Sequence, residues 1–203
     1  MNVKERFLKY VSYPTAANEE CCASPSSEGQ RALAEYICSE LIGLGLSDAC
    51  TDSYGYVYAT LPENAEGYAS VGLVAHMDTS PDAPGENIKA RTVEYEGGDL
   101  VLNAEKNIVM RADGYSVLEK YVGQRLIVTD GTTLLGADDK SGIAEIVTAI
   151  EKIISCGCPH GRIYVLFTPD EEIGRGTEHV DTARFCPDYA YTLDGGVLGE
   201  LEY

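Results

Sequence analysis

The sequence predicts an α/β fold, and three observations carry that prediction. Short β-prone segments alternate with amphipathic helical segments along the 203 residues, an order typical of α/β domains. Residues 71–75 are continuously apolar except for one glycine, as expected of a strand buried on both faces. Acidic residues and a histidine follow several of the strands, and open α/β sheets bind ligands at that edge. We therefore expect residues 1–203 to form a single domain.

Three helices are predicted from the spacing of apolar residues. The first covers residues 4–12, and the last covers residues 141–156, where isoleucine and valine recur at i, i+3, i+4 and i+7. The second begins at Ser27 and runs to about Leu44. Ser27 followed by Gln30 has the pattern of a capping box, in which both side chains bond to backbone N–H groups at the start of the helix.

The strands are predicted at residues 56–61, 71–75, 126–128, 162–167 and 189–193, which are rich in β-branched and aromatic residues. Residues 81–123 contain many Gly, Asp, Glu and Asn residues and only brief β-like pieces. We expect that stretch to be an excursion over the surface.

Composition excludes several classes of partner. The net charge of −18 disfavours nucleic acid and anionic membranes, because both require a basic surface. The first residues lack the apolar core of a signal peptide, and no apolar run approaches the ~20 residues that span a bilayer. We expect a cytoplasmic protein whose seven cysteines remain thiols. Neither Cys21-Cys22 nor Cys156-Gly157-Cys158 has the repeated C-x2-C spacing of a structural zinc site.

Four groups of candidate site residues follow the strands. His76 and Asp78 lie two residues apart, so their side chains point to one side of an extended chain, and the carboxylate can orient the imidazole. A hydrogen-bonded core histidine would give the same pattern. Asp138 stands immediately before the last helix, where it is equally consistent with an ordinary helix cap.

The remaining groups are also ambiguous when each is taken alone. Glu171 and Glu172 follow a strand and could divide metal binding from proton transfer, or they could form an exposed acidic turn. Asp194 precedes two glycines and could be a simple Asp-Gly turn. Together the groups supply many carboxylate oxygens and one imidazole, a set that suits two divalent ions such as zinc, manganese or cobalt.

Four strings around these residues resemble the tripeptide-aminopeptidase branch of the M20 metallopeptidases. They are Ala-His-Met-Asp-Thr-Ser-Pro-Asp (75–82), Leu-Leu-Gly-Ala-Asp-Asp-Lys (134–140), Phe-Thr-Pro-Asp-Glu-Glu-Ile-Gly (167–174) and Thr-Leu-Asp-Gly-Gly (192–196). Pro-Ser-Ser-Glu-Gly-Gln (25–30) also resembles that branch. The resemblance implies a three-layer sandwich of the zinc-exopeptidase kind, with a central mixed, largely parallel sheet.

The resemblance also implies a role for each residue. His76, Asp138 and Asp194 would bind one metal ion, and Asp138 and Glu172 would bind the other. Asp78 would orient His76. Glu171 would be the general base for a water activated by the two ions, and the family releases the N-terminal residue of short peptides such as tripeptides.

The chain departs from the family in length. It stops about where the family's lid domain begins, so the lid, the return half of the catalytic domain and the second histidine ligand are not expected here. His160 and His179 stand in no motif that matches the missing ligand. Two alternatives therefore stay open: a homologue that binds metal or a partner without catalysis, and an M20 amidohydrolase of another substrate class. The oligomeric state is not set by the sequence.

Overall fold

The computed structural model describes residues 1–197 and 199–201. The chain divides into two compact units. Met1–Pro81 and Gly136–Tyr203 form the first unit, and Asp82–Leu135 forms the second. That all of these residues make up one catalytic domain stays a prediction.

The first unit is built on a five-stranded sheet with the order β1-β2-β8-β3-β9. Its strands are β1 (Cys50–Thr51), β2 (Val57–Leu61), β8 (Ile163–Thr168), β3 (Val71–His76) and β9 (Tyr189–Thr192). β2 is antiparallel to both of its neighbours, while β8, β3 and β9 run parallel. The sheet is mixed, as predicted, and two of its four pairings are parallel.

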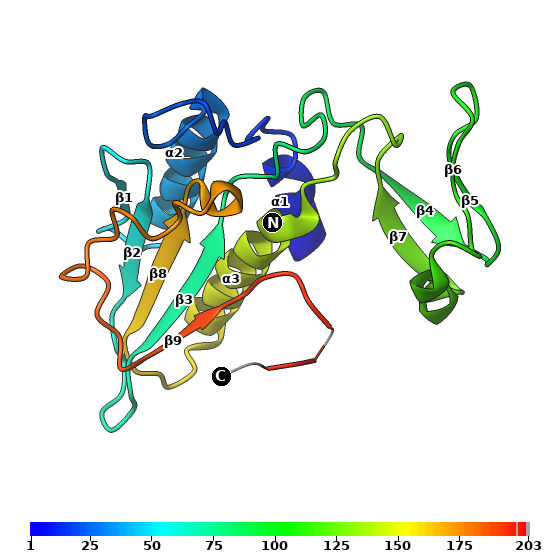
Figure 1. The fold of residues 1–203 in the computed structure, drawn as a ribbon. Helices are drawn as coiled ribbons and strands as arrows, with labels where there is room; N and C mark the ends of the chain where they lie inside the picture. The colour runs from blue at the N-terminus through cyan, green and yellow to red at the C-terminus, as the bar shows by residue number, and fades with distance from the viewer. Residues whose placement is uncertain (198, 202–203) are drawn as a thin grey trace. The chain divides into compact units, whose positions relative to one another are not determined.

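Three helices cover one face of this sheet: α1 (Val3–Tyr10), α2 (Glu28–Gly43) and α3 (Ala137–Cys156) (Figure 1). All three helices were predicted, because their apolar stripes are strong. On the other face, the irregular segment that follows the short 3-10 helix η2 (Glu171–Ile173) contributes Val180 and Phe185 to a cluster with Tyr56, Tyr58 and Leu166, whereas all four residues of β9 are exposed. The described residues thus supply a helical layer and a sheet, and the third layer stays a prediction.

The register of the central strands decides which loops meet. His76 pairs with Thr168 at the carboxyl ends of β3 and β8, and Val74 pairs with Thr192 of β9. The segments that follow these three parallel strands therefore leave the sheet side by side. This places the residues after His76, Thr168 and Thr192 at one edge, as the strand-end positions of the acids predicted.

The second unit has more structure than the expected surface excursion. β4 (Arg91–Tyr95) pairs with β7 (Gln124–Val128), and β5 (Leu100–Asn103) pairs with β6 (Ile108–Met110). A short 3-10 helix, η1 (Ser116–Tyr121), contributes to a small core with both strand pairs. That core consists of Tyr95, Leu100, Leu118 and Val128. These apolar residues are too far apart in the sequence to give a periodic signal.

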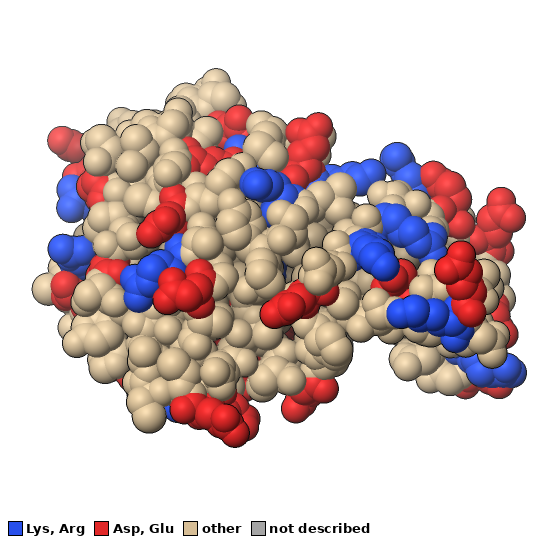
Figure 2. Space-filling model, turned by 90° about the horizontal axis from the view of Figure 1, so that it is seen from above, with Lys and Arg blue, Asp and Glu red and all other residues tan. Residues whose placement is uncertain are grey.

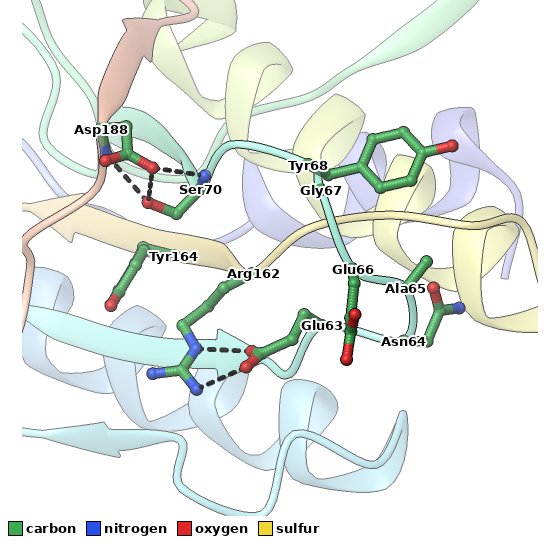
Figure 3. A pocket seen from close by; sticks show the side chains of 10 residues that line it. All are labelled: Glu63, Asn64, Ala65, Glu66, Gly67, Tyr68, Ser70, Arg162, Tyr164 and Asp188. Atoms are coloured by element: carbon green, nitrogen blue, oxygen red, sulfur yellow. Dashed lines mark hydrogen bonds and ion pairs between the residues drawn. The ribbon is translucent and has the colours of Figure 1, made fainter.

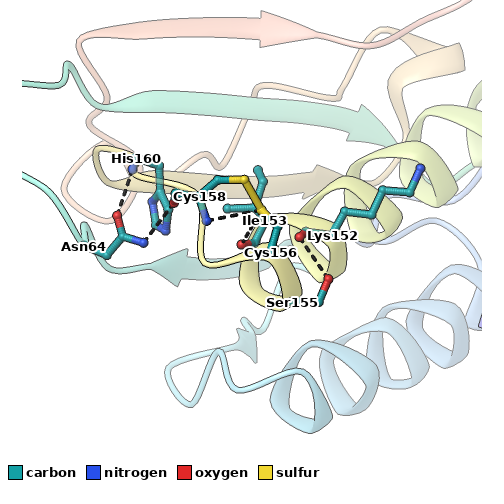
Figure 4. The surroundings of a disulfide bond; sticks show 7 residues. All are labelled: Asn64, Lys152, Ile153, Ser155, Cys156, Cys158 and His160. Atoms are coloured by element: carbon teal, nitrogen blue, oxygen red, sulfur yellow. Dashed lines mark hydrogen bonds between the residues drawn. A yellow bond between two sulfur atoms is a disulfide. The ribbon is translucent and has the colours of Figure 1, made fainter.

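The structure corrects one prediction about cysteine. Cys156 and Cys158 form a disulfide at the end of α3, near Asn64 and His160 (Figure 4). The prediction that all seven cysteines remain thiols is therefore wrong for this pair, whereas the other five cysteines are free. Among the described residues, no helix is both long enough and apolar enough to cross a membrane.

Candidate active site

His76 is the centre of the candidate site. It is the last residue of β3, and its side chain is only 3% exposed. Its Nε2 atom lies 2.8 Å from Asp138 Oδ1 and 3.9 Å from Asp194 Oδ1. Glu171 Oε2 is 3.8 Å from the same nitrogen. Carboxylates from three separate segments therefore converge on one imidazole nitrogen.

Three of these side chains have the geometry of a metal-binding group. Ligand atoms of His76, Asp138 and Asp194 all lie within 4.8 Å of one another. Two atoms that each lie about 2.1 Å from one ion can be at most about 4.2 Å apart, and both distances from His76 Nε2 are below that limit. One nitrogen and carboxylate oxygens are also donors that zinc and manganese accept. The residues thus fit a divalent metal ion.

The sequence left two roles open for an acid at this position: helix cap and metal ligand. In the structure these two roles fall to two neighbouring residues, Asp139 and Asp138. Asp139 caps the helix: its Oδ1 accepts a hydrogen bond from Gly142 N at 3.1 Å, and its Oδ2 accepts one from His76 N at 3.2 Å. Both acids have non-helical backbone angles, so the regular part of α3 begins after them. Asp138 is left free to turn its carboxylate towards His76.

Asp78 contacts both His76 and the turn that carries Glu171 and Glu172. Its buried carboxylate lies 3.3 Å from His76 Nδ1, an ion-pair distance without hydrogen-bond geometry. Its two oxygens also accept hydrogen bonds from the backbone N–H groups of Glu171 and Glu172, each at 3.0 Å. The role expected for Asp78, orienting His76, thus comes with a second contact that the sequence did not indicate.

The electrostatics of the site favour a bound cation. Burial lowers the pKa of His76, but the negative charges of Asp78, Asp139 and Asp194 outweigh it and raise that pKa to about 10. Burial and the charge of Asp138 also raise the pKa of Glu172. Carboxylates held this close together repel one another, and a positive charge among them relieves the repulsion.

Not every predicted ligand joins the three-residue group. Glu172 is not one of its members, so the predicted second metal site remains a proposal. His160 donates a hydrogen bond through Nδ1 to the carbonyl oxygen of Gly161, and His179 stacks on Tyr54 with ring centroids 3.9 Å apart. Neither histidine belongs to the group.

Two acids next to the predicted residues were missed as contributors to the site. Asp139 and Asp170 have no predicted role of their own and occur only within the strings 134–140 and 167–174. Both side chains are almost completely buried, at 1% and 0% exposed. Both acids lie in the strings around the site, directly beside a predicted site residue, and that position is the signal that the sequence offers. Their burial cannot be read from it.

The acids at the carboxyl ends of the strands are distinct from a surface hollow at the opposite ends. That hollow has a volume of about 780 Å³, and Glu63, Ser70, Arg162 and Asp188 are among its lining residues (Figure 3). Arg162 pairs with Glu63, and Ser70 bonds to Asp188. Arg162, Glu63 and Asp188 therefore already have partners within the hollow. Seen from above the carboxyl ends, acidic side chains are spread over the surface with Lys and Arg among them (Figure 2).

Comparison with known proteins identifies the group of proteins to which this site belongs. No protein-family model matches the chain. Peptidase T from Clostridium novyi is 50% identical over 204 residues, and peptidase T from Desulfitobacterium hafniense is 53% identical over 205 residues. These alignments cover 99% and 100% of this chain and 50% of each relative. The chain is a homologue of the amino-terminal half of peptidase T.

The structural comparison agrees with this homology. The crystal structure of aminopeptidase PepT from Bacillus cereus matches with a TM-score of 0.66 and 25% identity, over 96% of this chain and 43% of that one. The resemblance to the tripeptide-aminopeptidase branch of the M20 metallopeptidases is therefore confirmed, and the mixed sheet matches part of the PepT fold. The chain spans about half the length of the peptidase T relatives that it matches.

Proposed function

We propose that this chain carries the metal-binding catalytic half of an aminopeptidase that releases the N-terminal residue from tripeptides. The observation that supports it most is the meeting of His76, Asp138 and Asp194 within 4.8 Å in a homologue of peptidase T. Peptidase T is the name of relatives about twice this length, so both the activity and the substrate are proposals for this chain.

Five residues would provide the chemistry. His76, Asp138 and Asp194 would hold one divalent ion, most simply zinc, and Asp138 and Glu172 would hold a second. When bound, the ions supply Lewis-acid activation of a water molecule and of the scissile carbonyl. Because Asp138 is common to both sets, its carboxylate would link the two sites.

Glu171 is the proposed general base. Its carboxylate is about half exposed and lies 3.8 Å from His76 Nε2, so it can reach a substrate and a water molecule at the site. It would accept a proton from the attacking water and return that proton to the leaving amine. Asp78 would hold Glu171 in place through the backbone N–H of that residue, and it would hold His76 through Nδ1.

A second candidate function rests on the length of the chain. The group of three side chains can bind metal whether or not hydrolysis follows, and the chain aligns with only half of its relatives. A non-catalytic metal-binding homologue is therefore the alternative. Another M20 amidohydrolase specificity is less well supported, because the 50% identity is to proteins named peptidase T.

Metal binding and hydrolysis should be measured separately on residues 1–203. Calorimetric titration with zinc, manganese and cobalt gives the number of ions bound, and release of the N-terminal amino acid from a tripeptide gives the activity. We expect binding that is lost in His76→Ala. We also expect hydrolysis that falls by about 10²–10⁴-fold in Glu171→Gln, the range typical of a general base.

Glu178→Gln is the matched control, because Glu178 is an exposed acid a few residues after Glu171. It should leave metal binding and activity unchanged. Metal binding without any hydrolysis would favour the non-catalytic alternative. Full activity in Glu171→Gln would exclude the proposed mechanism, and full metal binding in His76→Ala would exclude the proposed site.

A further inference from the structure

A second buried carboxylate lies directly behind the candidate general base. Asp170 is the residue before Glu171, its side chain is 0% exposed, and its φ of 55° is in the left-handed region. Its oxygens accept hydrogen bonds from Ser26 N at 2.8 Å, from Ser26 Oγ at 2.5 Å and from Gln30 Nε2 at 2.7 Å. Three donors thus satisfy an acid that the proposed reaction does not use.

Gln30 is fully buried on α2 and binds Asp170 at two points. Its Nε2 donates to the Asp170 carboxylate, and its Oε1 accepts a hydrogen bond from Asp170 N at 3.1 Å. The capping-box prediction for Gln30 is therefore wrong. Ser27 is the N-cap of α2 but makes no side-chain capping bond to the backbone. The Gln30 Nε2 donates to Ser27 Oγ at 3.2 Å and, at the shorter distance of 2.7 Å, to Asp170, while its Oε1 accepts the backbone N–H of Asp170.

The turn that carries the two glutamates is consequently held on both sides. Gln30 accepts the backbone N–H of Asp170, and Asp78 accepts the N–H groups of Glu171 and Glu172. Three consecutive backbone N–H groups are fixed by two buried side chains, one on α2 and one in the segment that follows β3. A turn held in this way has one backbone orientation, which fixes where the next side chains begin.

A purely structural role explains this arrangement less well. Burying a carboxylate is costly even when it is hydrogen-bonded, and apolar side chains of similar size would fill the same space more cheaply. The Gln30 amide also donates to Ser26 Oγ at 3.3 Å and to Ser27 Oγ at 3.2 Å, but its shortest hydrogen bond, at 2.7 Å, is to the Asp170 carboxylate. Buried polar groups can be retained because they specify a single conformation. Such a role is expected at this turn, because its conformation sets the direction of Glu171 and Glu172.

We propose that Gln30 and Asp170 are positioning residues that aim the side chains of Glu171 and Glu172 at the metal site. This inference rests on the proposed function for the roles of the two glutamates. The arrangement predicts that loosening the turn changes the reaction step more than substrate binding. Residues that hold reacting groups in place typically act in that way, since a displacement of about 1 Å can cost about 100-fold in rate.

The test exchanges the two hydrogen-bonding roles. Gln30→Glu places a carboxylate against Asp170 and should free the turn. Adding Asp170→Asn restores a donor and an acceptor with their roles reversed. Hydrogen exchange of the backbone N–H groups of Glu171 and Glu172, followed by mass spectrometry or NMR, reports on the turn without requiring catalysis.

We expect faster exchange at these two amides in Gln30→Glu, and a return towards the original rate in the double variant. With zinc and a tripeptide, kcat should fall about 100-fold in Gln30→Glu with little change in KM, and the double variant should recover much of it. Leu33→Ala is the control, because Leu33 is buried on the same helix and its apolar side chain cannot hydrogen-bond to the turn. It lowers stability without selectively changing exchange at the turn.

The positioning role is overturned if Leu33→Ala and Gln30→Glu accelerate exchange at the turn equally when compared at matched stability. It is also overturned if the double variant behaves no better than Gln30→Glu. If the unsubstituted chain releases no amino acid in the presence of metal, the proposed function fails, and the exchange measurements still decide whether Gln30 holds the turn.

Discussion

The carboxylate of Asp78 accepts the backbone N–H of Glu171 at 3.0 Å, while the same carboxylate lies 3.3 Å from the imidazole of His76. One buried side chain thus links the candidate metal ligand to the candidate general base. Loss of this carboxylate should affect both functions together, which a residue that touches only one of them would not do.

Asp78→Asn should weaken zinc binding and peptidase activity each by about 10–100-fold, as is typical when the partner of a metal-binding histidine is changed. The amide presents an N–H₂ group to one backbone N–H, so one hydrogen bond to the turn is lost. Calorimetry and the tripeptide assay measure the two effects. Asp52→Asn is the matched control, because Asp52 also accepts two backbone N–H groups but lies in another turn. Equal losses in both variants would contradict the proposed role.

Zinc should stabilise the folded chain. Free zinc at 100 times its dissociation constant adds about 2.7 kcal/mol to the free energy of unfolding if only the folded state binds it. Thermal unfolding with zinc and with a chelator measures this difference. Asp194→Ala should reduce the stabilisation, because it removes one carboxylate from the group. Asp113→Ala changes an exposed acid of the second unit and should leave it intact. A zinc effect that is the same in Asp194→Ala would place the metal elsewhere.

Arg6→Met should destabilise the protein by about 1.5–3 kcal/mol, the usual contribution of hydrogen bonds to charged groups, because Arg6 is buried while its partners Glu40 and Glu151 are partly exposed. Arg6 is 1% exposed and lies 2.7 Å from both Glu40 and Glu151, so it connects α1 with α2 and α3. Arg162→Met removes an exposed pair with Glu63 and should cost about 0–1 kcal/mol. Urea unfolding of the two variants provides the comparison. Similar losses would show that burial of the Arg6 pair does not matter.

The same arginine should shape the acid dependence of stability. The hydrogen bond and charge of Arg6 lower the pKa of Glu151 below its ordinary value of 4.5. A carboxylate with a lowered pKa in the folded state stabilises the protein above pH 4.5, and that contribution is lost as the pH falls through the lowered pKa. The difference in stability between the original chain and Arg6→Met should therefore shrink below pH 4.5. A difference that stays constant down to pH 3 would exclude this linkage.

Gly142→Ala should destabilise the protein by about 1–3 kcal/mol, as overpacking usually does. A methyl group at Gly142 would lie 2.5 Å from both Asp139 Oδ1 and the carbonyl oxygen of Leu193, so α3 would have to move away from the end of β9. Gly43→Ala places the same methyl group on α2, where no atom lies within 4 Å, and should be neutral or slightly stabilising. The two variants can be compared by thermal unfolding and by zinc affinity. Unchanged zinc affinity in Gly142→Ala would show that the site tolerates this displacement.

Much of the fold could be predicted because the signals are local. The apolar stripe of residues 141–156 predicts a helix that the structure places at Ala137–Cys156, and the apolar run at 71–75 predicts the central strand Val71–His76. The small core of Asp82–Leu135 could not be predicted, since its apolar residues come from strands and a turn that are far apart in the sequence.

The sequence by itself determined which chemical groups stand at the candidate site: His76, Glu171, Glu172 and Asp194 lie at or just after the ends of apolar strands, and Asp138 lies at the start of α3. Tertiary structure alone decided how neighbouring acids divide their work. Asp139 caps α3 so that Asp138 can face the imidazole, and Gln30 accepts the backbone N–H of Asp170, a residue far away in the sequence. The physical reason is that a local pattern fixes where a side chain begins, whereas burial and distant partners select which of its hydrogen bonds is formed.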